Sequence, residues 1–169
     1  ICRPNVFRKF YNELYYFNDI KRFIKGERLS HSKEVAKLAY KLAKTNNLNV
    51  SNAYVAGLLH DIGKEVEEVE KLKIMDLHYK QYRELPKFAY HQFVGEYIAK
   101  NTFGIKDDSI LTAIKFHATG NSEMDDLAKI IYSADKIEPT RGFDSKDLID
   151  ACKANIETGF VTVLKANKE

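Results

Sequence analysis

The chain has 169 residues, of which 44% are hydrophobic and 30% charged, a composition typical of a single soluble globular domain. No apolar run approaches the roughly 20 residues needed to cross a bilayer, and a formal net charge of +3 is too small to indicate a nucleic-acid-binding protein. The two cysteines, Cys2 and Cys152, indicate neither a disulfide framework nor a thiolate metal site. Together with the lack of a long apolar run, this favours a cytoplasmic protein over a membrane-spanning one.

Apolar residues recur at intervals of three and four along almost the whole chain, which predicts an all-α domain. The first expected element is an aromatic amphipathic helix over residues 5–25. Because the chain begins at Ile1 rather than at a methionine, we interpret it as a trimmed form, a processed form or part of a longer protein. Residues 1–25 are then expected to be partly linker, and residues 26–169 the main domain.

The next predicted helix runs from Ser30 to about Thr45, because serine is a favoured N-cap residue and an apolar periodicity follows it. His31 heads the apolar stripe of this helix. An imidazole is thereby expected at the edge of the core, near the end of a helix.

The most informative feature of the chain is the doublet His60-Asp61, which ends the following predicted helix. Ser51 is the expected N-cap of that helix, Gly57 is expected to allow close approach of a neighbouring helix, and Gly63 is a candidate C′ residue. Adjacent side chains on a regular helix diverge by about 100°, so the last turn has to relax before both can bind one ion. On their own, these residues fit a metal site and a satisfied core histidine equally well.

Residues 65–85 alternate in charge and lack a strong apolar stripe, which predicts a solvent-exposed excursion. His78 lies in this excursion and is expected to have no role in a functional site. Pro86 is predicted to start another helix, with His91 at the head of its stripe and Gly104 after its end.

The next helix is expected to be capped by Asp107 or Asp108 and to be terminated by Gly120. His117 lies at the end of its apolar stripe. A fourth histidine therefore occupies the same kind of position as the first three.

A further helix is predicted from about Met124, with Asp135 at the foot of its stripe, and it has to end before Pro139. The tail from Ser145 is predicted to be one more amphipathic helix.

Several helices of a bundle can bring residues at the ends of their apolar stripes around one pocket. The candidates are His31, His60, Asp61, His91, His117 and Asp135. Imidazole and carboxylate groups without thiolate favour iron, manganese, cobalt or zinc over magnesium or calcium. Because six ligands exceed what one catalytic zinc needs, one or two ions are expected, with the Asp61 carboxylate as the candidate bridge.

A metal centre of this kind lowers the pKa of a bound water from about 15.7 toward 7 and stabilises charge on a phosphoryl oxygen. Phosphoester or phosphoanhydride hydrolysis is therefore the expected chemistry, with Asp61, His60 and Lys64 as the candidate catalytic residues. Arg28, Lys64 and Arg141 lie within a few positions of proposed ligands and are candidate phosphate contacts. Each of these cations also fits the interpretation of an ordinary surface residue.

The order of these residues resembles the HD superfamily of metal-dependent phosphohydrolases, and the two additional histidines resemble its two-metal branch. Five stretches within residues 26–165 resemble the bacterial YqeK family of symmetrical diadenosine tetraphosphate hydrolases. They are residues 28–31, 59–64, 91–95, 113–120 and 129–141. The last stretch contains the block Ala-Asp-x-Ile-Glu-Pro-x-Arg, which is far more specific than the His-Asp doublet.

The resemblance implies an HD-domain helical bundle that cleaves diadenosine tetraphosphate into two ADP. It also implies that a metal-bound hydroxide is the nucleophile, and that the metal is iron. The implied core metal ligands are His31, His60, Asp61 and Asp135. His91 and His117 match either second-metal ligands or phosphate contacts, while Arg28, Lys64 and Arg141 match positions expected near the nucleotide phosphates.

Two positions depart from the family pattern: Ala118 stands where a hydroxyl residue is common, and Lys136 replaces a residue that is more often aromatic. In some bacteria such domains are fused to a nicotinate-nucleotide adenylyltransferase, which would account for a chain that starts without methionine. Two alternatives stay open, namely hydrolysis of another nucleotide ester and a regulatory nucleotide-binding module without turnover. The sequence does not indicate an oligomeric state.

Overall fold

A computed structural model describes residues 18–167, which contain α-helices and short turns but no β-strand, so the predicted all-α fold is confirmed. The helices are α2 (Gly26–Thr45), α3 (Val50–Leu59), α4 (Glu68–His78), α5 (Tyr90–Asn101), α6 (Asp108–Lys115), α7 (Asp126–Ile137), α8 (Lys146–Ala154) and α9 (Ile156–Asn167), with single 3-10 turns η1 (Lys80–Tyr82), η2 (Lys87–Ala89) and η3 (Pro139–Arg141). Within this part of the chain, no helix is long and apolar enough to cross a bilayer.

The N-terminal helix predicted over residues 5–25 falls mostly outside the described residues. Of its described part, Ile20 and Ile24 are fully buried in the core. The proposed division into residues 1–25 and 26–169 stays a prediction.

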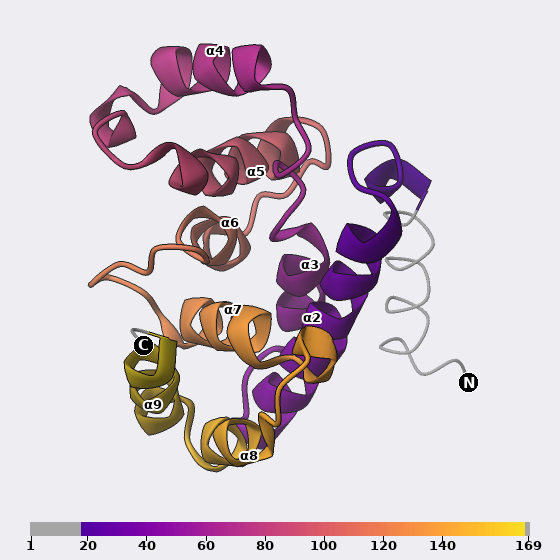
Figure 1. Cartoon of the computed structure of the whole chain (residues 1–169), viewed down its shortest axis with the longest axis vertical. Coiled ribbons are helices and arrows are strands. Elements are labelled where there is room, and N and C mark those ends of the chain that lie inside the picture. Colours follow the sequence, from indigo (N-terminus) through magenta and orange to yellow (C-terminus); the bar gives the residue numbers. More distant parts are fainter. Residues whose placement is uncertain (1–17, 168–169) are drawn as a thin grey trace.

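Helices α2 and α3 form the most extensive helix pair, and α7 packs against both of them as well as against α6 and α9. Figure 1 shows α4 and α5 at one end of the molecule, α8 and α9 at the other, and α6 and α7 between them. The candidate site residues lie in α2, α5 and α7 and just after the ends of α3 and α6.

Close packing of α2 on α3 depends on a residue without a side chain. A Cβ atom added at Gly57 would lie 2.6 Å from the Cα atom of Ala36, which no helix pair can accommodate without moving apart. The expected close approach at Gly57 is therefore confirmed. It holds the end of α3 against α2, which carries His31.

Two of the predicted helix starts are wrong by part of a turn or more. Ser30 is not a cap, because α2 already begins at Gly26, and the N–H of Leu29 bonds to the carbonyl of Lys25 at 3.4 Å. Ser51 lies inside α3, whose N-cap is Asn49; its side chain accepts a hydrogen bond from the N–H of Asn52 at 3.0 Å. Asparagine is as good a cap as serine, so sequence preference alone does not choose between them.

Two other starts depend on caps that lie close to the predicted positions. Asp107 caps α6 by accepting hydrogen bonds from the N–H groups of Ser109 and Ile110, as one of the two expected residues. Asp125 caps α7, just after the predicted start at Met124.

Pro86 precedes the 3-10 turn η2 rather than starting α5, which begins at Tyr90. At the other end of α7, Pro139 does stop the helix as predicted, because α7 ends at Ile137.

The charged segment over residues 65–85 is not a solvated excursion throughout. Helix α4 packs on α5, and its Ile74 and Met75 are buried, whereas Val69 and Leu77 remain 74% and 70% exposed. The apolar stripe of α4 is too short to be recognised among the charged residues around it.

The tail from Ser145 forms two helices instead of one. The chain turns at Asn155, and α9 folds back on α8, where a Cβ atom at Gly159 would lie only 2.6 Å from the Cα atom of Cys152. Asn46 fixes this corner, because its side chain donates to the carbonyl of Cys152 at 2.9 Å and accepts from the N–H of Ile156 at 2.8 Å. The break therefore depends on a residue far away in the sequence.

Candidate metal centre

His60 and Asp61 converge because α3 ends at Leu59 and the doublet lies in the turn that follows. The Nε2 atom of His60 is 3.5 Å from Oδ2 of Asp61. The expected C′ role of Gly63 is wrong, since Gly63 does not adopt a left-handed conformation. Gly63 is needed for space instead: a Cβ atom there would lie 2.6 Å from the carbonyl oxygen of His91. The turn is thereby held against α5.

Three of the histidines are oriented in the same way. In each, Nδ1 donates a hydrogen bond to the backbone carbonyl three residues earlier. The pairs are His60 with Gly57 at 2.6 Å, His91 with Phe88 at 2.6 Å and His117 with Ile114 at 2.7 Å. Because a carbonyl can only accept, Nδ1 carries the proton and Nε2 is left as the acceptor, which is the state that binds a metal.

The two oxygens of Asp61 face different histidines. Oδ2 lies 3.5 Å from His60 Nε2 and 4.0 Å from His31 Nε2. Oδ1 lies 3.3 Å from His117 Nε2 and 3.5 Å from His91 Nε2. The carboxylate therefore stands between two sets of imidazoles, in the position predicted from the sequence for a bridging ligand.

Asp135 closes the site on the side of α2. Its Oδ1 atom lies 2.8 Å from His31 Nε2 and 3.3 Å from His60 Nε2. Behind His31, the carboxylate of Glu138 lies 3.6 Å from Nδ1 and is 1% exposed. Sequence reasoning assigned no role to Glu138, although it belongs to the specific block at the end of α7.

The donor atoms are close enough together to share an ion. Within each of three triads, the ligand atoms lie within 4.8 Å of one another. The triads are His31, His60 and Asp61; His60, His117 and Asp135; and Asp61, His91 and His117. The Nε2 atom of His60 is buried and has no hydrogen-bond partner, as expected for a nitrogen that is kept for a metal.

Neighbouring charges keep both carboxylates ionised, as a cation requires, while Asp61 and Asp135 raise the pKa of His60 against the effect of burial. Burial alone would raise the pKa of Asp61, but the charge of His60 and the nearby His117 and His91 rings hold it well below its usual range. The pKa of Asp135 is likewise held low against burial, chiefly by the charge of Lys136. Burial lowers the pKa of His117 to about 4. At neutral pH both carboxylates are ionised and His117 is neutral.

Basic side chains surround the cluster. Arg28 donates to Asp61 Oδ2 at 3.2 Å, and Arg141 donates to Asp135 Oδ1 at 3.0 Å. Lys136 departs from the family pattern in sequence and was not predicted as a site residue. It donates to the carbonyl of His117 at 2.6 Å and to Asp135 Oδ2 at 3.1 Å.

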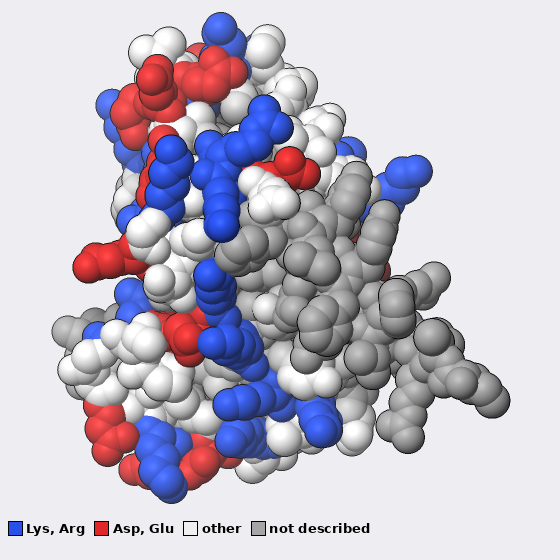
Figure 2. Space-filling view, turned by 90° about the vertical axis from the view of Figure 1, so that its right-hand side faces the viewer, with Lys and Arg blue, Asp and Glu red and all other residues white. Residues whose placement is uncertain are grey.

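Lys64 makes no ion pair with any residue in the described part of the chain, so its charge remains available to an anion. Figure 2 shows Lys and Arg side chains gathered in a band along the described surface. Such a band attracts anionic ligands.

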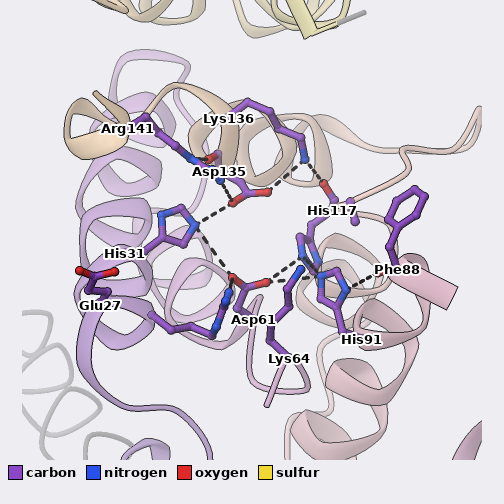
Figure 3. Close-up of a pocket in the computed structure, with 12 residues that line it drawn as sticks. Glu27, His31, Asp61, Lys64, Phe88, His91, His117, Asp135, Lys136 and Arg141 are labelled. Carbon is purple, nitrogen blue, oxygen red and sulfur yellow. Dashed lines mark hydrogen bonds and ion pairs between the residues drawn. The ribbon is translucent and has the colours of Figure 1, made fainter. Parts of the chain in front are cut away.

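The side chains open onto a pocket of about 480 Å³ (Figure 3). Every predicted site residue lines it except His60, which is fully buried behind the others. Four residues that were not predicted also line it: Glu27, Phe88, Ala118 and Lys136. His78 lines a different cavity and stacks on Tyr97, with ring centroids 4.8 Å apart.

A sequence profile of the HD domain matches residues 28–140, a range that contains all six candidate ligands. The chain belongs to the HD-domain family. This membership and the His-Asp cluster together indicate a divalent metal.

Known proteins resemble the chain in sequence and in structure. A Mycoplasma genitalium protein named as a probable nicotinate-nucleotide adenylyltransferase/Ap4A hydrolase is 34% identical over 164 residues, which cover 91% of this chain and 46% of that protein. A symmetrical bis(5'-nucleosyl)-tetraphosphatase from Staphylococcus aureus is 33% identical over 130 residues, 75% of this chain and 66% of that protein. The chain thus spans about half the length of the Mycoplasma relative.

A crystal structure from Clostridium acetobutylicum, described as a predicted HD superfamily hydrolase involved in NAD metabolism, superposes with a TM-score of 0.77. It is 30% identical in sequence, and the match covers 89% of this chain and 84% of that one. The HD-domain helical bundle expected from the sequence is therefore confirmed.

Proposed function

We propose that this chain is a metal-dependent phosphohydrolase that cleaves diadenosine tetraphosphate symmetrically into two ADP. The observation that carries the proposal is the Asp61 carboxylate, whose two oxygens face separate pairs of histidines at the bottom of a cation-rich pocket. The names of the relatives from S. aureus and M. genitalium support this substrate.

The proposed core metal ligands are His31, His60, Asp61 and Asp135. His91 and His117 would complete a second site across Asp61 or contact phosphate. A metal ion bound here would supply a water of lowered pKa and would stabilise charge on a phosphoryl oxygen. Iron is our first candidate, and manganese, cobalt and zinc suit the same nitrogen and oxygen donors.

The chain's own cations give the pocket its preference for a polyphosphate. Arg28 and Arg141 are 34% and 41% exposed, so their guanidinium groups can contact both the site carboxylates and an incoming phosphate. Lys64 and Lys136 add two ammonium groups on the same lining. Lys64, which has no competing ion pair among the described residues, would offset the charge of a departing ADP.

Two wider aspects belong to the proposal. A fused nicotinate-nucleotide adenylyltransferase domain is supported only by the name and the greater length of the M. genitalium relative. A cytoplasmic location is in keeping with a nucleotide substrate.

The direct test is product analysis. The purified chain is loaded anaerobically with ferrous iron, or with manganese, cobalt or zinc, and incubated with diadenosine tetraphosphate before chromatography. We expect ADP as the sole product. Equal amounts of ATP and AMP would contradict symmetrical cleavage, and faster turnover of another member of a nucleotide panel would favour a different ester. Nucleotide binding without turnover for any metal would favour the regulatory alternative.

A further inference from the structure

Phe88 is an exposed aromatic residue at the mouth of the pocket. Its relative exposure is 64%, although the next two residues, Ala89 and Tyr90, are buried. Within the lining of the pocket, Phe88 and Ala118 are the apolar residues, and the others are charged or histidine. Folding therefore leaves one large ring exposed to solvent beside a strongly polar site.

The backbone of Phe88 is anchored to the candidate metal centre. The carbonyl of Phe88 accepts the hydrogen bond that orients His91, at 2.6 Å, and Phe88 lies in η2 immediately before α5. The N–H of Ala89 bonds to the carbonyl of Pro86 at 2.9 Å and closes this turn. Figure 3 shows Phe88 beside His91 and His117, at the opposite edge of the pocket from Arg141. The backbone of Phe88 is thus fixed beside the site, and its ring lies at the mouth of the pocket.

A nucleotide has the complementary arrangement, since a flat base is joined to a chain of anionic phosphates. We propose that Phe88 is the stacking surface for a nucleobase whose phosphates lie among the cations of the pocket. This inference rests on the proposed function, because it takes the ligand to be a nucleotide. Stacking uses a π-face that every base has, so Phe88 is expected to contribute affinity with little preference for adenine over guanine.

The absence of tryptophan from the sequence provides a direct test. The substitution Phe88→Trp introduces a single indole at the mouth of the pocket, and stacking of a base on it should quench its fluorescence. We expect saturable quenching by ADP and by GDP but little change with pyrophosphate, which has no base. The control is Val161→Trp, at a position in α9 that is 44% exposed and outside the pocket lining; neither nucleotide should quench it.

A kinetic test uses Phe88→Ala, which should fold normally because the ring is exposed. We expect KM for diadenosine tetraphosphate to rise about tenfold with kcat largely unchanged, since one base stacked on an aromatic ring contributes about 1–3 kcal/mol. Binding of pyrophosphate, measured by calorimetry, should stay as in the wild type.

The outcomes separate the two proposals. Quenching of the indole fluorescence of the F88W variant by ADP, in a protein that does not cleave diadenosine tetraphosphate, would support the base subsite and reject the proposed reaction. Cleavage by the wild type, together with an F88W signal that ADP leaves unchanged or that pyrophosphate quenches equally, would overturn the base subsite. An unchanged KM in Phe88→Ala would overturn it as well.

Discussion

The Nε2 atom of His60 lies 3.3 Å from Oδ1 of Asp135, although one residue follows α3 and the other is near the end of α7. Burial of these two side chains costs free energy, because a carboxylate and an imidazole both lose hydration in the core. Their proximity makes the candidate metal centre a product of helix packing, and several consequences can be measured.

Replacement of Asp61 by asparagine should remove the bridge while keeping its shape. We expect the D61N protein to fold, to retain little metal after purification without chelator, and to lose at least about 100-fold in turnover, the upper end of what even an outer-shell partner costs. Metal analysis and steady-state kinetics measure both effects. Asp147→Asn, at an exposed position on α8, is the matched control and should behave as wild type. Full metal content in D61N would contradict the proposed ligand set.

Glu138 should act on the metal through His31. Its carboxylate, 3.6 Å from Nδ1, favours a proton there and leaves Nε2 to bind. In Glu138→Gln we expect metal affinity to fall by about 10- to 100-fold, with the hydrogen bond from the N–H of Thr140 retained. Competition with a chelator measures the affinity, and Glu70→Gln, exposed on α4, is the control. Unchanged affinity in Glu138→Gln would mean that the carboxylate only caps the turn.

Gly63→Ala should separate the metal-binding turn from α5. The added Cβ atom would meet the backbone around His91 and Gly95 at 2.6–2.7 Å, so the turn has to shift. We expect a loss of about 1–3 kcal/mol in the free energy of unfolding, measured with urea, and a lower metal content. Ser51→Ala, on the exposed side of α3, should change neither. A wild-type unfolding midpoint in Gly63→Ala would argue against this tight contact.

Cys152 should be an inert thiol. It is buried between α8 and α9, and burial raises its pKa to about 11, so little thiolate forms at neutral pH. In a Cys2→Ser background, we expect a colourimetric thiol reagent to label Cys152 slowly in the native protein and rapidly in urea. Fast native labelling would show that the corner between α8 and α9 opens readily.

His78 is the negative control among the histidines. It stacks on Tyr97 and lines a cavity separate from the candidate metal centre. His78→Ala should therefore leave metal content and turnover close to wild type in the same assays. A large loss of turnover would mean that α4 influences the site.

The clustering of the candidate ligands could be predicted because histidines and aspartates at the ends of apolar stripes have to meet where helices of a bundle meet. Helix starts could not be predicted equally well: Asn49 and Ser51 are both good caps, and only tertiary packing selects one of them. The break at Asn155 depends on the distant Asn46. Glu138 was missed because its burial depends on contacts that the sequence does not reveal.

The central claim is that Asp61 holds metal between two sets of histidines. An anomalous-scattering map, recorded at the absorption edge of the loaded metal from crystals of the wild-type protein, tests it most directly. We predict anomalous density at the Asp61 carboxylate, with His31, His60 and Asp135 around one ion and His91 and His117 beside a second ion if two are bound. If crystals of fully loaded protein showed anomalous density elsewhere and none in this pocket, the proposed metal site at Asp61 would be contradicted.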